Sequence, residues 1–248
     1  MSVRVVHAAA KGRKKYLLPF GDLHYGHPNF DTESAKGYLE WAKKNDAWIL
    51  LMGDLLENSS KDSVGAGVYE QIMNPDEQKY RIVDMLEPYK HLILGLLTGN
   101  HEERTFKTSG HDPSRSMAKM LGVPYLRYGA FLRLLVNDVG YTVYATHGGS
   151  GSATSAGKLN AVKKLATWVS ADIYLMGHMH DLLVDSSIRK TLDLRNKVVR
   201  DRRQTFCVTG SFLTFEDSYS EMKGYSPGRI GSPRIRLSGM EEDCHISL

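Results

Sequence analysis

The chain has 248 residues, of which 42% are hydrophobic and 24% are charged, with a formal net charge of +4. This composition is ordinary for a folded α/β protein, and it excludes a disordered, collagen-like or fibrous chain. The charge is mild and unevenly distributed, so it bears on local contacts more than on the whole surface.

Short apolar runs alternate along the chain with stretches of helical spacing. The pattern predicts buried strands over 16–20, 47–52, 92–98, 141–146 and 172–176. It predicts helices over 32–45, 77–89, 114–121 and 158–170. This alternation indicates an α/β fold with a partly parallel sheet, organised as one domain over residues 1–248.

After Leu182 the pattern becomes richer in strands. Candidate strands cover 183–188, 197–200, 205–209 and 235–237. We therefore expect a second sheet that is built largely from this part of the chain.

Residues that commonly bind metals follow five of the predicted strands. The five motifs are GDLHYG, LLMGDLLEN, LLTGNHEER, YATHGG and LMGHMH. Because ligands of open α/β sheets gather beyond the carboxyl ends of strands, we expect the five segments to meet at one rim of one sheet. The glycines that precede the ligands are expected where the chain turns sharply, namely at Gly21, Gly53, Gly99 and Gly177.

The side chains in these motifs form a mixed set of carboxylate, imidazole and amide ligands without a thiolate. Such a set suits Mn, Fe, Zn or Co, and does not suit Cu(I) or an iron–sulfur cluster. The residues are too many for one ion, but they suit two ions if one carboxylate bridges them. Two divalent ions, two carboxylates and a hydroxide leave a positive centre, which attracts an anionic phosphoryl group.

The five motifs, in this order from Asp22 to His180, resemble those of the calcineurin-like metallophosphoesterases. The match covers about two thirds of the chain. The resemblance implies a four-layer α/β/β/α sandwich of two mixed sheets flanked by helices. It also implies a phosphoesterase that uses two divalent metal ions, with manganese expected first and zinc, iron, cobalt or nickel as alternatives.

The resemblance further implies a role for each residue of the motifs. The first metal would be held by Asp22, His24 and His180. The second metal would be held by Asn100, His147 and His178, and Asp54 would bridge both. A hydroxide between the metals would attack the phosphorus, with His101 facing the leaving group as general acid.

Other residues near the motifs are candidates for supporting roles. Glu102 is expected to hold a metal ligand or His101 by a hydrogen bond. Arg104 is a candidate contact for substrate phosphate, with a solvent-exposed arginine as the alternative, and His27 is a candidate for lining the pocket. The glycine-rich segment 149–159 lacks the spacing of a P-loop, and we expect a mobile loop at the rim, the alternative being an inert connection.

The basic residues are concentrated between Arg189 and Arg203. This stretch has seven basic residues against Asp193 and Asp201, so the rest of the chain carries a net charge of −1. Two interpretations remain open, a strand pair with a solvent-exposed face and a contact with a nucleic-acid backbone.

The motifs favour some phosphoester substrates over others. Serine/threonine protein phosphatases carry Gly-Asp-x-Val-Asp-Arg-Gly where this chain has GDLLENS, so that branch is disfavoured. DLHYG resembles the repair-nuclease branch and small phage phosphoesterases, although the chain has no room for a long DNA-capping domain. We predict a phosphodiesterase acting on DNA or RNA as a nuclease. The alternatives are a phosphomonoesterase or cyclic-nucleotide phosphodiesterase for small molecules, and a non-catalytic scaffold, against which the complete ligand set argues.

The sequence also gives expectations about location and partners. No apolar run approaches the roughly 20 residues that cross a bilayer, and the N-terminal segment is unlike a secretory signal. We expect a cytoplasmic protein with no membrane contact and no obligate protein partner. Cys207 and Cys244 lie too far apart for a zinc-binding spacing and are expected to be reduced thiols.

Overall fold

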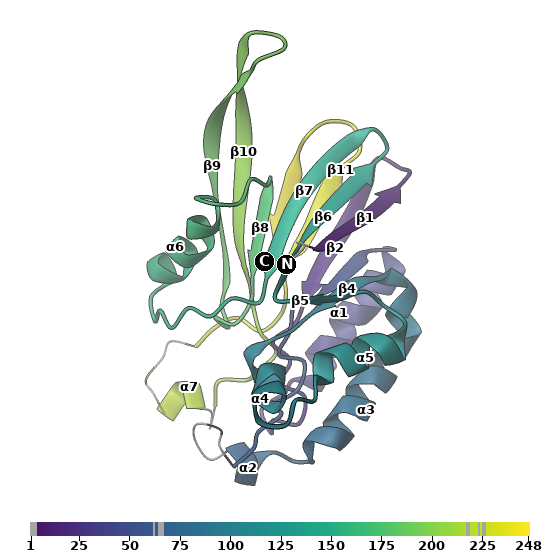
Figure 1. Ribbon diagram of the computed structural model, residues 1–248, viewed down its shortest axis with the longest axis vertical. Helices are drawn as coiled ribbons and strands as arrows, with labels where there is room; N and C mark the ends of the chain where they lie inside the picture. Colours follow the sequence, from purple (N-terminus) through teal and green to yellow (C-terminus); the bar gives the residue numbers. More distant parts are fainter. Residues whose placement is uncertain (1–3, 62, 64–66, 217–218, 223, 225–226) are drawn as a thin grey trace.

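The computed structural model describes residues 4–61, 63, 67–216, 219–222, 224 and 227–248. Within these residues, twelve strands form two mixed sheets of six strands each (Figure 1). The first sheet has the order β1 (Arg4–Ala10), β6 (Gly129–Val136), β7 (Val139–Thr146), β8 (Ile173–Met176), β10 (Val198–Thr209) and β9 (Leu182–Asp193). The second has the order β12 (Cys244–Ser247), β11 (Arg234–Ser238), β2 (Lys14–Phe20), β3 (Trp48–Leu51), β4 (Ile93–Leu97) and β5 (Tyr125–Arg127).

Four of the five longer helices begin after a side chain that caps their free N–H groups. The longer ones are α1 (Thr32–Lys44), α3 (Pro75–Leu86), α4 (Asn100–Ser109), α5 (Pro113–Leu121) and α6 (Ser155–Leu165). Asp31, Asn74, Asp112 and Thr154 each accept a hydrogen bond from a backbone N–H in the first turn of the helix that follows. Shorter helical segments are α2 (Gly67–Glu70), the 3₁₀ turn η1 (Glu87–Leu92) and α7 (Tyr219–Met222).

The packing of apolar side chains gives four layers. Between the sheets, Leu50 and Met52 of the β3 segment pack in one cluster with residues of the first sheet such as Leu132. Helices α1, α3 and α5 cover the outer face of the second sheet, whereas α6 packs on the outer face of the first. The α/β/β/α sandwich expected from the family resemblance is therefore confirmed.

Two predicted helices have different ends from those expected. The stretch 77–89 is split into α3 and η1, because Pro88 has no N–H with which to continue an α-helix. The helix expected over 158–170 runs from Ser155 to Leu165, since Thr154 caps it earlier.

The expected second sheet, built largely from the residues after Leu182, is wrong. Strands β9 and β10 join the first sheet, where β10 runs parallel to β8, and β11 and β12 join the second sheet beside β2. The sequence pattern missed β1 and β6, which pair in parallel along their length. Both strands alternate between more and less exposed residues, and a single polar residue, His7 in β1 and Arg133 in β6, interrupts their apolar residues.

No helix in the described residues is long and apolar enough to cross a membrane. Both thiols are free, with Cys207 buried and Cys244 partly exposed.

Candidate metal centre

The predicted ligands come together at one edge of the sandwich, but they do not come from one sheet. Asp22, Asp54 and Asn100 follow β2, β3 and β4 of the second sheet, whereas His147 and His178 follow β7 and β8 of the first. The expectation of a single sheet is corrected here. Because β2, β3 and β4 are mutually parallel, as are β7 and β8, each sheet gathers its ligands at the carboxyl ends of its strands.

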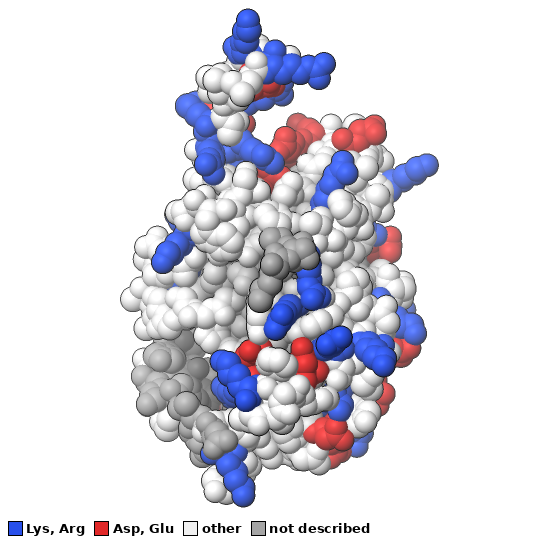
Figure 2. All heavy atoms as spheres, viewed as in Figure 1, with Lys and Arg blue, Asp and Glu red and all other residues white. Residues whose placement is uncertain are grey.

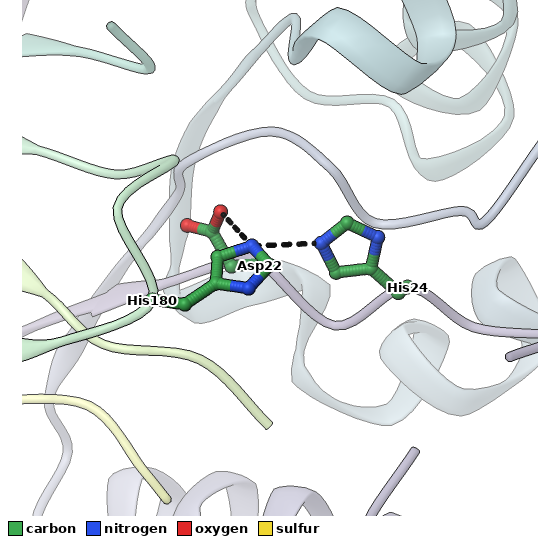
Figure 3. A group of neighbouring side chains, drawn as sticks. All are labelled: Asp22, His24 and His180. Carbon is green, nitrogen blue, oxygen red and sulfur yellow. Dashed lines mark hydrogen bonds and ion pairs between the residues drawn. The ribbon is translucent and has the colours of Figure 1, made fainter. Parts of the chain in front are cut away.

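The first group of ligands is Asp22, His24 and His180 (Figure 3). Nε2 of His180 lies 3.3 Å from Oδ1 of Asp22 and 3.1 Å from Nε2 of His24. Two imidazole nitrogens and a carboxylate that point at one another suit a shared cation. This group therefore fits one divalent metal ion.

The second group is formed by Asn100, His147 and His178, together with Asp54. Oδ1 of Asn100 lies 3.0 Å from Nε2 of His147 and 2.7 Å from Nδ1 of His178. Nε2 of His147 is also 3.2 Å from Oδ2 of Asp54. These oxygen and nitrogen donors converge in the manner of a second metal site.

Asp54 lies between the two groups, and its two oxygens have different neighbours. Oδ1 accepts a hydrogen bond of 2.8 Å from the backbone N–H of His101. Oδ2 lies 3.2 Å from His147 of the second group and 3.9 Å from Nε2 of His24 in the first. This position fits a carboxylate shared by two ions.

The backbone of the ligand segments adopts conformations that are uncommon for residues with a side chain. Five of the predicted ligands have φ between 47° and 67°, namely Asp22, His24, Asp54, His178 and His180. Such conformations persist only where the surroundings impose them, and they cluster at functional sites.

The glycines before the ligands are required for two different reasons. Gly53 has φ of +91°, so the expected sharp turn is present there. Gly99 and Gly177 are needed instead for close approach. A Cβ on Gly99 would overlap Oδ1 of Asp54, and one on Gly177 would lie 2.7 Å from Oδ2 of Asp22.

Glu102 lies buried behind Asp54 and holds the backbone of its loop. Its carboxylate accepts hydrogen bonds from the N–H groups of Asp54, Leu55, Leu56 and Gly99, at 2.8 to 3.1 Å. Burial and the charge of Asp54 raise the pKa of Glu102 to about 7, while the N–H donors favour its ionised form. Glu102 thus joins the loop after β3 to the start of α4.

Glu57 is part of the site, and the sequence analysis did not single it out. Its Oε2 lies 3.2 Å from Nδ1 of His24, and its Oε1 accepts a 2.6 Å hydrogen bond from Ser59. The Nδ1–H of His24 therefore points to Glu57, which leaves Nε2 free to face the cation site. The one signal in the sequence is a second carboxylate three residues after Asp54 in GDLLEN.

The charges of the buried ligands depend on one another. Burial, followed by the charge of His101, lowers the pKa of His24 to about 4, so its ring is neutral at neutral pH. Burial opposes a charge on His147, but the carboxylate of Asp54 raises its pKa to about 10. Nδ1 of His147 donates to the carbonyl of Met52 at 3.0 Å, which directs Nε2 into the second group.

His101 begins α4 beside Asn100 but has other partners. Its Nδ1 donates to the carbonyl oxygen of Glu57 at 2.6 Å, and its Nε2 lies 3.9 Å from Oδ2 of Asp54. The guanidinium of Arg104 lies 3.4 and 3.2 Å from the two ring nitrogens. A cation and a proton-carrying ring thus lie together beside the centre.

His27 and the glycine-rich segment lie near the other predicted residues. His27 is partly buried, burial lowers its pKa, and its electrostatic neighbours include His101 and His180. In the segment 149–159, α6 begins at Ser155, and Lys158 forms an ion pair of 3.3 Å with Asp181. The expected mobility of this segment stays a prediction.

The basic run lies on the long hairpin of β9 and β10, which projects from the body of the protein (Figures 1 and 2). The expected strand pair is present, but the outer part of the hairpin is exposed on both faces and not on one. β9 starts two residues after His180, and the eleven steps between its twelve residues carry the tip about 36 Å away at about 3.3 Å per step. Four basic residues form ion pairs, namely Lys190 with Asp201, Arg200 with Asp193, Arg202 with Asp172 and Arg203 with Asp243. Contact with nucleic acid stays a prediction.

Comparisons with known proteins give remote likenesses only. No family model and no curated protein matches this sequence. Similar solved structures include Vps29 of Entamoeba histolytica complexed with zinc, at 14% identity and a TM-score of 0.40, covering 94% of this chain and 98% of that one. Vps29 of Cryptosporidium parvum has 13% identity and a TM-score of 0.41, covering 95% and 98%. A metallophosphoesterase of Sphaerobacter thermophilus has 13% identity and a TM-score of 0.38, covering 94% and 88%. The resemblance to the calcineurin-like metallophosphoesterases is thus carried by the five motifs in their order and by the sandwich that brings them together.

Proposed function

We propose that this chain is a hydrolase that cleaves phosphodiester bonds of nucleic acid with two divalent metal ions. The observation that supports this most is the position of Asp54 between two groups of ligands, 3.2 Å from His147 and 3.9 Å from His24. A centre of two ions that share a carboxylate is suited to displacement at phosphorus.

The residues of the two groups would hold the ions. Asp22, His24 and His180 would bind one ion, Asn100, His147 and His178 the other, and Asp54 both. Manganese is our first expectation, and zinc, iron, cobalt and nickel also suit these ligands. When bound, such ions supply Lewis acidity that activates water and stabilises charge on the phosphate oxygens.

The remaining chemistry belongs to side chains of the protein. His101 holds its Nδ1 proton on the carbonyl of Glu57, so Nε2 is the nitrogen that delivers a proton to the leaving oxygen. Arg104 lies beside this ring and is suited to bind an oxygen of the phosphate. Glu57 and Glu102 do not touch substrate in this proposal, and they hold His24 and the Asp54 loop in position.

Two features favour nucleic acid as the substrate. DLHYG resembles the repair nucleases and small phage phosphoesterases. The β9–β10 hairpin carries basic side chains on its exposed surface, and three of them, Arg189, Arg195 and Lys197, form no ion pair within the described residues. Basic groups of this kind favour contact with phosphate backbones.

The proposal is tested by assaying the purified chain with manganese against three substrates. These are single-stranded DNA, a cyclic dinucleotide and a simple phosphomonoester. We expect cleavage of DNA, and its loss in His178→Ala prepared in the same way, which controls for contaminating nucleases. Hydrolysis of the phosphomonoester or the cyclic dinucleotide alone would support the small-molecule alternative, and no hydrolysis of any of them would contradict the proposal.

A further inference from the structure

An exposed tyrosine, Tyr128, is held by two segments that also carry predicted metal ligands. Tyr128 follows β5, and 46% of its surface is exposed. Its hydroxyl donates to Oε1 of Glu103 at 2.8 Å, and its carbonyl accepts from Oγ1 of Thr146 at 2.8 Å. Glu103 is on the first turn of α4 with Asn100, and Thr146 directly precedes His147. Both anchors therefore lie within a few residues of predicted metal ligands.

The strand register of the second sheet also places Tyr128 near the segment that carries Asn100. Arg127 of β5 pairs with Leu97 of β4, and its carbonyl accepts from the N–H of Thr98 at 2.6 Å. Thr98 is two residues before Asn100. Tyr128 is thus level with the end of β4 and the start of α4, where Asn100 and His101 lie.

The ring of Tyr128 has a cationic neighbour. The guanidinium of Arg127 lies 5.0 Å from the ring centroid. Arg127 itself has φ of +62°, an uncommon conformation for a residue with a long side chain. A partly exposed aromatic ring with a guanidinium over it is the kind of surface on which nucleobases stack, regardless of their identity.

We propose that Arg127 and Tyr128 form a platform on which a nucleobase of the substrate stacks while its phosphate is held at the metal centre. This inference rests on the proposed function and narrows its substrate class to esters of nucleosides. Stacking contacts the face of a base and not the edges that distinguish one base from another. The platform should therefore raise the affinity for substrate without selecting among the four bases.

A second exposed tyrosine with a cationic neighbour lies away from the predicted ligands and can serve as a control. Tyr80 on α3 is 50% exposed, and Nζ of Lys79 lies 4.8 Å from its ring centroid. It has a similar exposure and the same type of cationic neighbour, but α3 packs on the outer face of the second sheet. Tyr80→Ala is therefore the control for the effect of removing an exposed tyrosine.

The experiment measures competitive inhibition of the hydrolysis of methyl p-nitrophenyl phosphate. The inhibitors are thymidine 5′-monophosphate, thymidine 3′-monophosphate and methyl phosphate, which has no base. We expect at least one nucleotide to bind the wild type more tightly than methyl phosphate. Tyr128→Ala should weaken nucleotide binding by about 5- to 150-fold, the range that corresponds to one stacked base. Tyr128→Phe, which keeps the ring, should retain most of the preference.

The outcomes separate this inference from the proposed function. Hydrolysis of the ester without any preference for nucleotides, or a preference that survives Tyr128→Ala, would overturn the platform and leave the phosphodiesterase standing. An equal loss in Tyr80→Ala would also overturn it. If the wild type does not hydrolyse the ester, the proposed function fails, and calorimetric titration with the same three ligands still decides whether Tyr128 binds a base.

Discussion

His101 and His178 both lie beside Asn100, and their contacts fit the two different roles that we propose for them. Nδ1 of His178 is 2.7 Å from the amide oxygen of Asn100 and thus belongs to the second group of ligands. His101 donates to a backbone carbonyl and keeps Nε2 3.9 Å from Asp54. One residue is suited to hold an ion and the other to deliver a proton.

This difference predicts a difference between two substrates. A nucleic-acid diester expels an alkoxide that needs a proton, whereas a nitrophenyl diester expels a stabilised phenolate. A positioned general acid contributes about 10²–10⁴-fold, so His101→Ala should lose most activity on DNA and far less on the nitrophenyl diester. His178→Ala should lose both activities together. The measurement is the ratio of the two rates in each variant.

Metal analysis of the same two variants completes this test. His101→Ala should keep its metal, and His178→Ala should lose metal from the second group. If both variants lose metal and both rates fall equally, His101 is a metal ligand, and its assignment as the general acid is wrong.

The residues at the centre could be predicted because short motifs specify them. The motifs Asp-x-His and Gly-His-x-His themselves contain the predicted metal ligands. Glu57 could not be predicted in this way, because its contact with His24 depends on how the loop after β3 lies against the loop after β2. The four backbone N–H groups that donate to Glu102 could not be predicted either, because these contacts depend on how α4 packs against that loop.

At the scale of elements, the β9–β10 hairpin separates two kinds of basic residue. Arg200, Arg202 and Arg203 are each paired with an aspartate, whereas Arg189, Arg195 and Lys197 form no ion pair in the described part of the chain. Paired groups are already partly neutralised. The unpaired ones are therefore the better candidates for a phosphate backbone.

We predict that changing Arg189, Arg195 and Lys197 to Gln weakens DNA binding and flattens its salt dependence. The slope of log affinity against log salt should fall by about 0.7–0.9 for each DNA phosphate that the variant no longer neutralises. The matched control changes Arg200, Arg202 and Arg203 to Gln, and it should alter the slope less. Fluorescence anisotropy with labelled DNA over a range of salt concentrations measures both, and an unchanged slope in the first variant would mean that the hairpin does not bind DNA.

Many elements could be predicted from the sequence, whereas β1, β5, β6, β12 and α4 were missed. β2, β3, β4, β7 and β8 are short apolar runs, since both of their faces are largely covered. β9 and β10 were expected only in pieces, because their outer halves leave the sandwich and carry polar residues on both faces. Their twelve backbone pairs hold them together where the side-chain pattern fails.

At the scale of the whole molecule, the candidate metal centre depends on the packing of the two sheets. Three ligand segments come from the second sheet and two from the first, and the apolar cluster between the sheets fixes their distance. The strand pattern placed all five ligand segments in one sheet, which is wrong, because a run of buried residues identifies a strand but not the strands with which it pairs. The family resemblance of the motifs predicted the four-layer sandwich. Where the ligand segments converge is seen only in the pairing and packing of the two sheets.

The proposal that Asp54 joins two metal sites is tested most directly by elemental analysis of the protein, after it is loaded with manganese and free ions are removed. We predict about two ions per chain, because the ligands form two groups with Asp54 between them. Asp54→Asn should lower the content of both ions, whereas Asp84→Asn on the exposed face of α3 should keep the wild-type content. A single ion in the wild type, or two ions retained in Asp54→Asn, would contradict a centre in which this carboxylate joins the two sites.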